Sequence, residues 1–148
     1  MRAAARYDRS EIADSLPTQH DFEEAARLRE ALRRFLREAE EVTRRHGLSP
    51  RHHELLLMIS ASEGGRSTVS ELVERLQLTQ STVTELVQRA EESGLLRRQQ
   101  SPADGRVIHL SLTDEGASRL AAAVAELGPE RDRLLQMLHR DEPVASNG

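Results

Sequence analysis

The sequence predicts a mainly α-helical fold that carries one small β-hairpin, and three patterns predict it. From Phe22 onward, apolar residues recur at alternating steps of three and four over about six helical turns. Two shorter helical patterns are then separated by a tight break at residues 77–79. Residues 95–99 and 107–112 have the character of strands on either side of a turn-forming run. The length of 148 residues suits one compact unit.

The first helix is expected over residues 22–47. Its apolar stripe consists of Ala25, Leu28, Leu32, Phe35, Ala39 and Val42, spaced as in a heptad pattern. Gly47 is a suitable residue to end this helix, because glycine accepts the left-handed backbone of a helix C-terminus. Ser49 and Pro50 then fit the N-cap and first position of a second helix, which runs to about Ala61.

A helix-turn-helix is predicted after the loop at residues 62–67. Thr68 and Glu71 have the spacing of a capping box, which opens a short helix through Leu76. After the break, Thr79 caps a further helix that ends at Gly94. Two helices joined by a three-residue turn are typical of a helix-turn-helix.

The hairpin follows directly after this helix pair. Ile108, Leu110 and Leu112 alternate with Val107, His109 and Ser111, as the two faces of a strand do. The loop at residues 100–105 returns the chain from the first strand. A helix-turn-helix followed by a hairpin predicts a winged helix over residues 48–113.

Two more helices complete the chain over residues 114–140. Thr113 caps the first of them, with Asp114 and Glu115 in the first turn, where negative charge favours the helix dipole. The predicted buried face consists of Leu120, Val124 and Leu127, and the apolar face of the last helix consists of Leu134, Leu135 and Leu138. Gly128 and Pro129 separate the two helices. Residues 1–21 are expected to be an N-terminal extension and residues 141–148 a tail.

The composition excludes several classes of function. The sequence has no cysteine, which rules out disulfides, thiolate nucleophiles and thiol-based sensing. No catalytic signature or phosphate-binding loop is found, so we expect neither an enzyme nor a cofactor. The polar N-terminus and the absence of a run of about 18 apolar residues predict a soluble, cytoplasmic protein. The net charge of −4 means that any contact with DNA must depend on geometry rather than on a broad basic surface.

The helix at residues 79–94 has the pattern of a recognition helix. Val83, Leu86, Val87 and Ala90 form its buried stripe, and the opposite face is short and polar at its N-terminal end. Glutamine on this face could pair with adenine, and Glu85 could accept from the N4 amino group of cytosine. An ordinary solvated helix face has the same composition, but its place between a short helix and a hairpin favours nucleic-acid binding.

Arginines gather at the predicted hairpin. Arg97 and Arg98 lie on its first strand and Arg106 at its tip, where Asp104 could pair with Arg106 and orient it. Such an arginine could enter a minor groove, where the negative potential is concentrated. This is the alternative to a merely structural hairpin.

Histidines raise the question of a metal site. His52 and His53 are adjacent, about 100° apart on a helix, so they lack the i, i+4 spacing that helical metal sites favour. We therefore expect no metal ion. His53 lies on the same side as Leu56 and Leu57, which predicts either a buried histidine or a polar group in a small-molecule cavity.

Three stretches resemble the MarR family (multiple antibiotic resistance regulators). They are GLSPRHHELLLMI, TVSELVERLQLTQSTVTELVQRAEESGLLRR and DGRVIHLSLTDEG, and the likeness covers residues 22–140. The resemblance implies a homodimer in which residues 22–47 and 114–140 form the dimerisation helices. It implies a transcriptional regulator that binds a pseudo-palindromic DNA operator, commonly a repressor released by a small aromatic or phenolic anion.

The resemblance also places the site residues. Those implied for DNA binding are Gln80, Ser81, Thr82, Thr84, Glu85, Gln88, Arg89, Arg97, Arg98, Asp104 and Arg106. The residues predicted to bind such a ligand are His20, Arg27 and His53, which are cationic or titratable groups on helices that flank the winged helix. Glu85 stands at a position that is often basic in the family, and His53 stands where many relatives have tyrosine. The alternative function, of another class, is a winged-helix dimer that acts as a protein–protein interaction module.

Overall fold

A computed structural model describes residues 16–139 and confirms the predicted fold class. By its internal contacts the chain divides into two units, whose described parts are residues 16–34 and 35–139. The expected single compact unit is therefore corrected. The physical reason is that no residue of 16–34 is buried, so this stretch contributes nothing to a common core. The expected tail at residues 141–148 and most of the N-terminal extension lie outside the described residues.

The first helix, α2, spans Gln19–Arg45 and begins earlier than the predicted Phe22. Thr18 and Asp21 form a reciprocal cap, in which the Asp21 carboxylate accepts from the Thr18 amide at 2.6 Å. The Thr18 hydroxyl in turn accepts from the Asp21 amide. This cap has the logic of a capping box with aspartate at its fourth position, and these hydrogen bonds with Thr18 lower the pKa of Asp21.

The predicted helix ends of the winged helix are confirmed. Helix α3 (Pro50–Ser60) is capped by Ser49, α4 (Val69–Leu76) by the Thr68–Glu71 capping box, and α5 (Gln80–Glu92) by Thr79. Gln77 has the left-handed backbone (φ 54°) that turns the chain between α4 and α5. The helix-turn-helix thus follows from local capping and turn chemistry, as expected.

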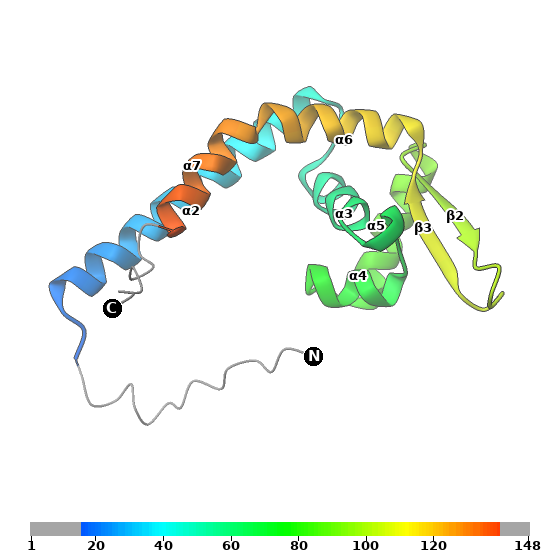
Figure 1. The fold of residues 1–148 in the computed structure, drawn as a ribbon, viewed down its shortest axis with the longest axis horizontal. Helices are drawn as coiled ribbons and strands as arrows, with labels where there is room; N and C mark the ends of the chain where they lie inside the picture. The colour runs from blue at the N-terminus through cyan, green and yellow to red at the C-terminus, as the bar shows by residue number, and fades with distance from the viewer. Residues whose placement is uncertain (1–15, 140–148) are drawn as a thin grey trace, which may run out of the picture. The chain divides into compact units, whose positions relative to one another are not determined.

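A three-stranded antiparallel sheet with the order β1-β3-β2 completes the winged helix. Figure 1 shows the hairpin formed by two of these strands, β2 and β3. Strands β2 (Leu96–Gln100) and β3 (Ile108–Leu112) form the predicted hairpin. Residues 62–67, expected as a loop, instead contain a 3₁₀ turn, η1 (Glu63–Gly65), and strand β1 (Arg66–Ser67), which pairs with β3. A strand of two residues is too short to show alternation in the sequence. It is defined by its hydrogen-bonded pairing with β3.

The face predicted for the second strand is only partly buried. Leu110 is fully buried and Leu112 half-buried, but Ile108 is 41% exposed. The hairpin therefore extends past the core at the end where Ile108 pairs with Gln100. Alternation in the sequence predicted the direction of the side chains correctly, but not how far the sheet is covered.

Helices α6 (Asp114–Glu126) and α7 (Gly128–His139) follow the sheet, with Thr113 as the predicted cap of α6. The main core consists of buried residues from α3, α4, α5, α6, the sheet and the connections before α3 and β2: Leu48, Leu55, Leu56, Ile59, Leu72, Val83, Val87, Ala90, Leu95, Leu96, Leu110 and Leu120. Val42, Ala123 and Leu127 form a second, smaller cluster. Through it, the C-terminal part of α2 packs against α6.

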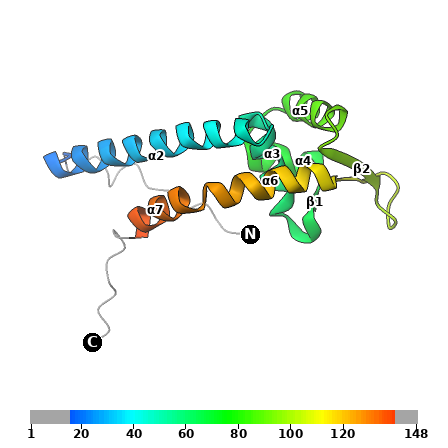
Figure 2. The same cartoon turned by 90° about the horizontal axis from the view of Figure 1, so that it is seen from above.

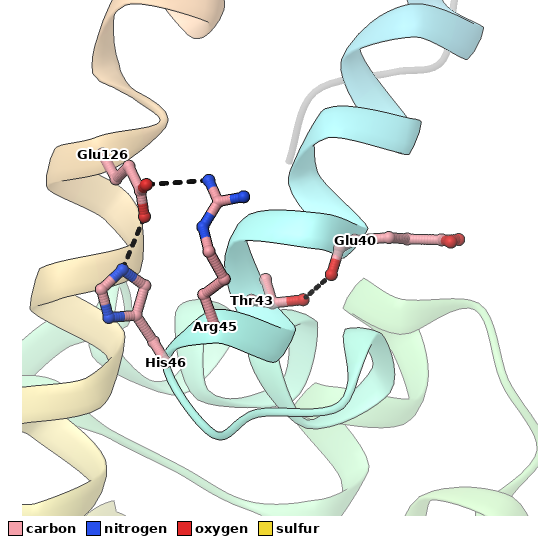
Figure 3. A network of polar contacts seen from close by, with 5 residues as sticks. All are labelled: Glu40, Thr43, Arg45, His46 and Glu126. Carbon is pink, nitrogen blue, oxygen red and sulfur yellow. Dashed lines mark hydrogen bonds and ion pairs between the residues drawn. The ribbon is translucent and has the colours of Figure 1, made fainter.

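A polar contact reinforces this smaller cluster at the surface (Figure 3). The carboxylate of Glu126 on α6 accepts from Arg45 at 2.8 Å and contacts Nε2 of His46 at 2.6 Å. These two partners, His46 first, lower the pKa of Glu126. Beside them, the buried Thr43 hydroxyl donates to the Glu40 carbonyl oxygen at 3.0 Å. Polar and apolar contacts thus join the end of α2 to α6.

Candidate nucleic-acid interface

Helix α5 presents one buried and one exposed face, as its sequence predicts. Val83, Val87 and Ala90 are fully buried, and Leu86 is half-buried beside them. The Thr79 side chain accepts from the Thr82 amide at 3.3 Å and caps the helix. The Thr82 hydroxyl also lies 2.8 Å from that of Thr79, so Thr82 belongs to the cap as well as to the exposed face.

The exposed face of α5 bears a shallow, open hollow. Gln80, Ser81, Thr84, Glu85 and Gln88 line a surface depression of about 500 Å³. None of these residues is bulky or apolar. A helix that enters a major groove needs such a face, because side chains must reach base edges without steric clash.

Two residues of this face are held by neighbours one turn away. The Gln88 amide donates to Glu92 at 3.3 Å, and Nη2 of Arg89 donates to Oε1 of Glu85 at 2.5 Å. Both contacts are exposed, so they contribute little to the stability of the fold. The two contacts do restrict the conformations of Gln88 and Arg89, which the sequence pattern alone does not indicate.

The hairpin, hereafter the wing, lies beside this helix: α5 contacts the start of β2 (Figure 2). On β2, Arg97 donates to the Ser111 hydroxyl at 3.3 Å. Arg98 donates to both carboxylate oxygens of Glu91 on α5, at 3.2 and 3.3 Å. Arg98 therefore ties the wing to α5, a role that sequence analysis missed because Glu91 and Arg98 are on different elements.

At the tip of the wing, Asp104 supports Arg106 differently from the prediction. Oδ1 of Asp104 accepts from the backbone amide of Arg106 at 3.0 Å, as in an Asx turn. Within residues 16–139 the two side chains form no ion pair, so the expected pairing of their charges is corrected. The aspartate fixes the backbone of the tip and leaves the guanidinium of Arg106 exposed and without a protein partner among the described residues.

A second hollow, of about 430 Å³, joins the wing to the start of α4. Arg98 and Arg106 line it from the wing, and Thr68, Val69 and Ser70 line it from α4. Sequence analysis placed Thr68 in a capping box but did not place Ser70 in the site. The capping box could have indicated Ser70, because it marks a helix N-terminus, and a helix N-terminus offers amide donors to an anion.

The residues predicted to bind a ligand are not brought together within either unit. His20 and Arg27 belong to residues 16–34, where both are exposed and His20 contacts Glu24 at 3.3 Å. His53 belongs to the other unit and is half-buried. Its Nε2 is buried without a hydrogen-bond partner, and burial lowers its pKa, which favours a neutral imidazole.

A further histidine, His109 of β3, was not selected from the sequence as a site residue. Its Nδ1 is also buried without a partner, and the ring borders a hollow of about 670 Å³. The other lining residues include Glu63, Arg66, Glu71 and Arg75. In the described part of the chain, no three His, Asp or Glu side chains are placed to hold a metal ion. Among residues 16–139, no helix is long and apolar enough to span a membrane.

Comparison with known proteins finds transcriptional regulators that are similar to this chain. The family model described as MarR family matches residues 46–107, from the end of α2 to the wing. The chain is 34% identical over 98 residues to the HTH-type transcriptional repressor MdtR of Bacillus subtilis. That alignment covers 66% of this chain and only 62% of the length of MdtR.

Solved structures share the fold over most of the chain. The regulator AbsC of Streptomyces coelicolor matches with a TM-score of 0.69 and 22% identity, over 84% of each chain. Sco3205 of the same organism, solved in complex with DNA, matches with a TM-score of 0.66 and 23% identity, over 87% of this chain and 80% of its own. The family model and the curated relatives show that residues 46–107 and their surroundings are similar to MarR-family regulators, and the solved structures show the same winged-helix fold.

Proposed function

We propose that the protein is a homodimeric transcriptional repressor that binds a pseudo-palindromic operator in double-stranded DNA. One observation carries this proposal: the exposed face of α5, which is polar and has no bulky side chains, lies beside a wing whose tip holds an exposed arginine. The helix suits a major groove and Arg106 suits the adjacent minor groove. The likeness to Sco3205, whose structure contains DNA, and to the repressor MdtR supports the same function. Such a protein would act in the cytoplasm, with its DNA.

The dimer is proposed from apolar side chains that the described chain leaves exposed. On α2, Phe22 is 60% and Leu36 59% exposed, and Leu28 and Leu32 are also exposed. On α7, Leu135, Met137 and Leu138 are exposed. Large side chains repeated along two helices leave more apolar surface than a soluble monomer usually presents. A symmetric partner that covers both surfaces would remove it from water.

Light scattering of the protein at micromolar concentration is expected to give about twice the chain mass. Leu36→Glu together with Leu138→Glu should shift the protein toward monomer, because each places a charge in the proposed interface. Leu16→Glu adds the same charge at a site that is 91% exposed and precedes α2, and should leave the dimer intact. A stable wild-type monomer would contradict the architecture.

A small aromatic or phenolic anion is the proposed signal that releases the DNA. The supporting observation is the unpartnered Nε2 of His53, whose hydrogen bond a phenol or carboxylate could supply. His20 and Arg27 stay predictions from the sequence, since a cationic group can pair with such an anion.

Salicylate titrated against the protein–DNA complex is expected to weaken binding, and His53→Ala should reduce this response severalfold. His109→Ala is the matched control, because it removes a second ring with an unpartnered buried nitrogen. Both variants should first be shown to retain the wild-type unfolding midpoint. An equal response in wild type and His53→Ala would remove His53 from the site.

A protein–protein interaction module is the alternative function. Arg89 and Arg98 are both paired with carboxylates, and these carboxylates offset the positive charge of the face. Retention on heparin and a salt-sensitive mobility shift of random duplex separate the two functions. DNA binding predicts both, because released counterions make the affinity fall as salt rises. A module that binds only protein predicts neither.

A further inference from the structure

Glu85 is an unexpected residue at the centre of a face proposed to bind DNA. Its side chain is 62% exposed, and it lines the hollow of α5 together with Gln80, Ser81, Thr84 and Gln88. A carboxylate in this position repels phosphates and cannot be explained as a contact to the DNA backbone. It is compatible with DNA binding only where it meets a hydrogen-bond donor.

Arg89 holds this carboxylate in place. Its Nη2 donates to Oε1 of Glu85 across one helical turn, and both side chains are exposed to similar extents, 65% and 62%. Among the described residues, Oε2 of Glu85 has no hydrogen-bond partner and keeps its acceptor capacity. The guanidinium therefore offsets the negative charge and orients one free oxygen outward from the helix.

Arg89 is itself placed at the edge of the face, next to α3. His52 of α3 is half-buried, and its pKa is lowered by burial first and by the charge of Arg89 second. A neutral His52 carries no positive charge that would repel Arg89 or compete with it for Glu85. The pair is thus a feature of the helix surface that is present before any DNA is bound.

The chemistry of base edges then selects one base. In the major groove, guanine and thymine present acceptors at O6, N7 and O4, which an acceptor-only carboxylate cannot pair with. Adenine presents a donor at N6 next to an acceptor at N7, which suits an amide better than a carboxylate. Cytosine presents the N4 amino donor without a neighbouring acceptor on its major-groove edge.

We infer that Glu85 is a specificity-determining residue that selects cytosine at one position of each half-site, with Arg89 as its positioning residue. The inference rests on the proposed DNA-binding function and deepens it. The base pair addressed by Glu85 is C·G, with cytosine on the strand that faces the free carboxylate oxygen.

The decisive variant is Glu85→Gln, which keeps the shape of the side chain and replaces one acceptor oxygen by a donor amide. Glutamine pairs with adenine through N6 and N7, so the selected base should change from cytosine to adenine. Wild type and variant are each used to select duplexes from a randomised library. Affinities are then measured on the enriched site with C·G and with A·T at that position. In Glu85→Gln, we expect the ratio of the affinity for C·G to the affinity for A·T to fall about tenfold per half-site relative to wild type, so that the variant prefers A·T.

Glu92→Gln is the matched control for the loss of charge. Glu92 is exposed on the same helix and contacts Gln88, but it does not line the hollow. This variant should change the affinity for all sequences alike and leave the preference for C·G in place. Arg89→Ala should weaken the preference, and Arg89→Lys should restore part of it, because lysine retains the charge but not the fork of the guanidinium.

The outcomes separate this inference from the proposed function. If Glu85→Gln raises the affinity for every sequence equally, Glu85 only repels phosphates, and the inference is overturned while DNA binding stands. If the wild type binds no duplex at any salt concentration, the proposed function and the inference are both overturned. A change of the selected base from cytosine to adenine supports both.

Discussion

Replacing Gly116 by alanine is expected to destabilise the protein by about 3 kcal/mol or more, at the upper end of the range for overpacking. Gly116 is buried in the first turn of α6, where its amide donates to the cap residue Thr113 at 3.1 Å. A Cβ at this position would lie far inside van der Waals contact with the carbonyl oxygen of Leu95. The obstacle is backbone, which cannot swing aside as a long side chain can.

The surrounding contacts make that obstacle rigid. The amide of Thr113 donates to the Leu95 carbonyl at 3.0 Å, and the Thr113 hydroxyl donates to the Gly94 carbonyl at 2.6 Å. Leu95 itself is 2% exposed and belongs to the main core. Relief of the clash would therefore separate α6 from the winged helix and break the cap of α6.

Urea denaturation of Gly116→Ala measures this effect, and Gly105→Ala is the matched control. Gly105 lies at the wing tip, and an added Cβ there would have no heavy atom within 4 Å. The control should unfold within about 0.5 kcal/mol of the wild type. A Gly116→Ala variant as stable as this control would show that α6 can move away from Leu95 without loss.

Local chemistry explains what the sequence could predict. Ser49, Thr68, Thr79 and Thr113 each cap the helix expected of them, because a cap involves residues only a few positions apart. The exposed face of α5 followed in the same way from its buried stripe. The periodicity of one helix determines both of its faces.

Contacts between elements explain what could not be predicted. Strand β1 exists through β3, and the pair of Glu91 with Arg98 depends on how α5 lies against the wing. Glycine is required at position 116 because a side chain there would clash with the carbonyl oxygen of Leu95, 21 positions earlier in the chain. None of these partners can be found from spacing within one segment, since they are fixed by tertiary packing.

Arg106→Ala is expected to have the largest effect on DNA binding of any single change in the wing. Its guanidinium has no protein partner within residues 16–139, while its backbone is held by Asp104. The whole charge is therefore available to the DNA. Loss of this charge should lower the affinity for many sequences and reduce the slope of log affinity against log salt by about one unit per half-site.

Gln88→Ala should weaken binding in a different way. Gln88 is neutral, lines the hollow of α5 and would exchange its contact with Glu92 for one with a base edge. Its loss should cost about 1–3 kcal/mol at one base position and leave the salt slope nearly unchanged. The two variants thus distinguish a contact that contributes charge from a contact that reads sequence.

Affinities at several salt concentrations, on the selected operator and on its single-base variants, measure both effects at once. Arg133→Ala is the control for charge alone, because Arg133 lies on α7, outside the winged helix, and is 72% exposed. It should change the slope less than Arg106→Ala does, since counterions are released where the protein meets phosphates. If Arg106→Ala and Arg133→Ala bind with the same affinity and slope, the tip of the wing does not contact DNA. The hairpin then serves only to return the chain from α5 to the cap of α6, and Asp104 stabilises a turn without a function in recognition.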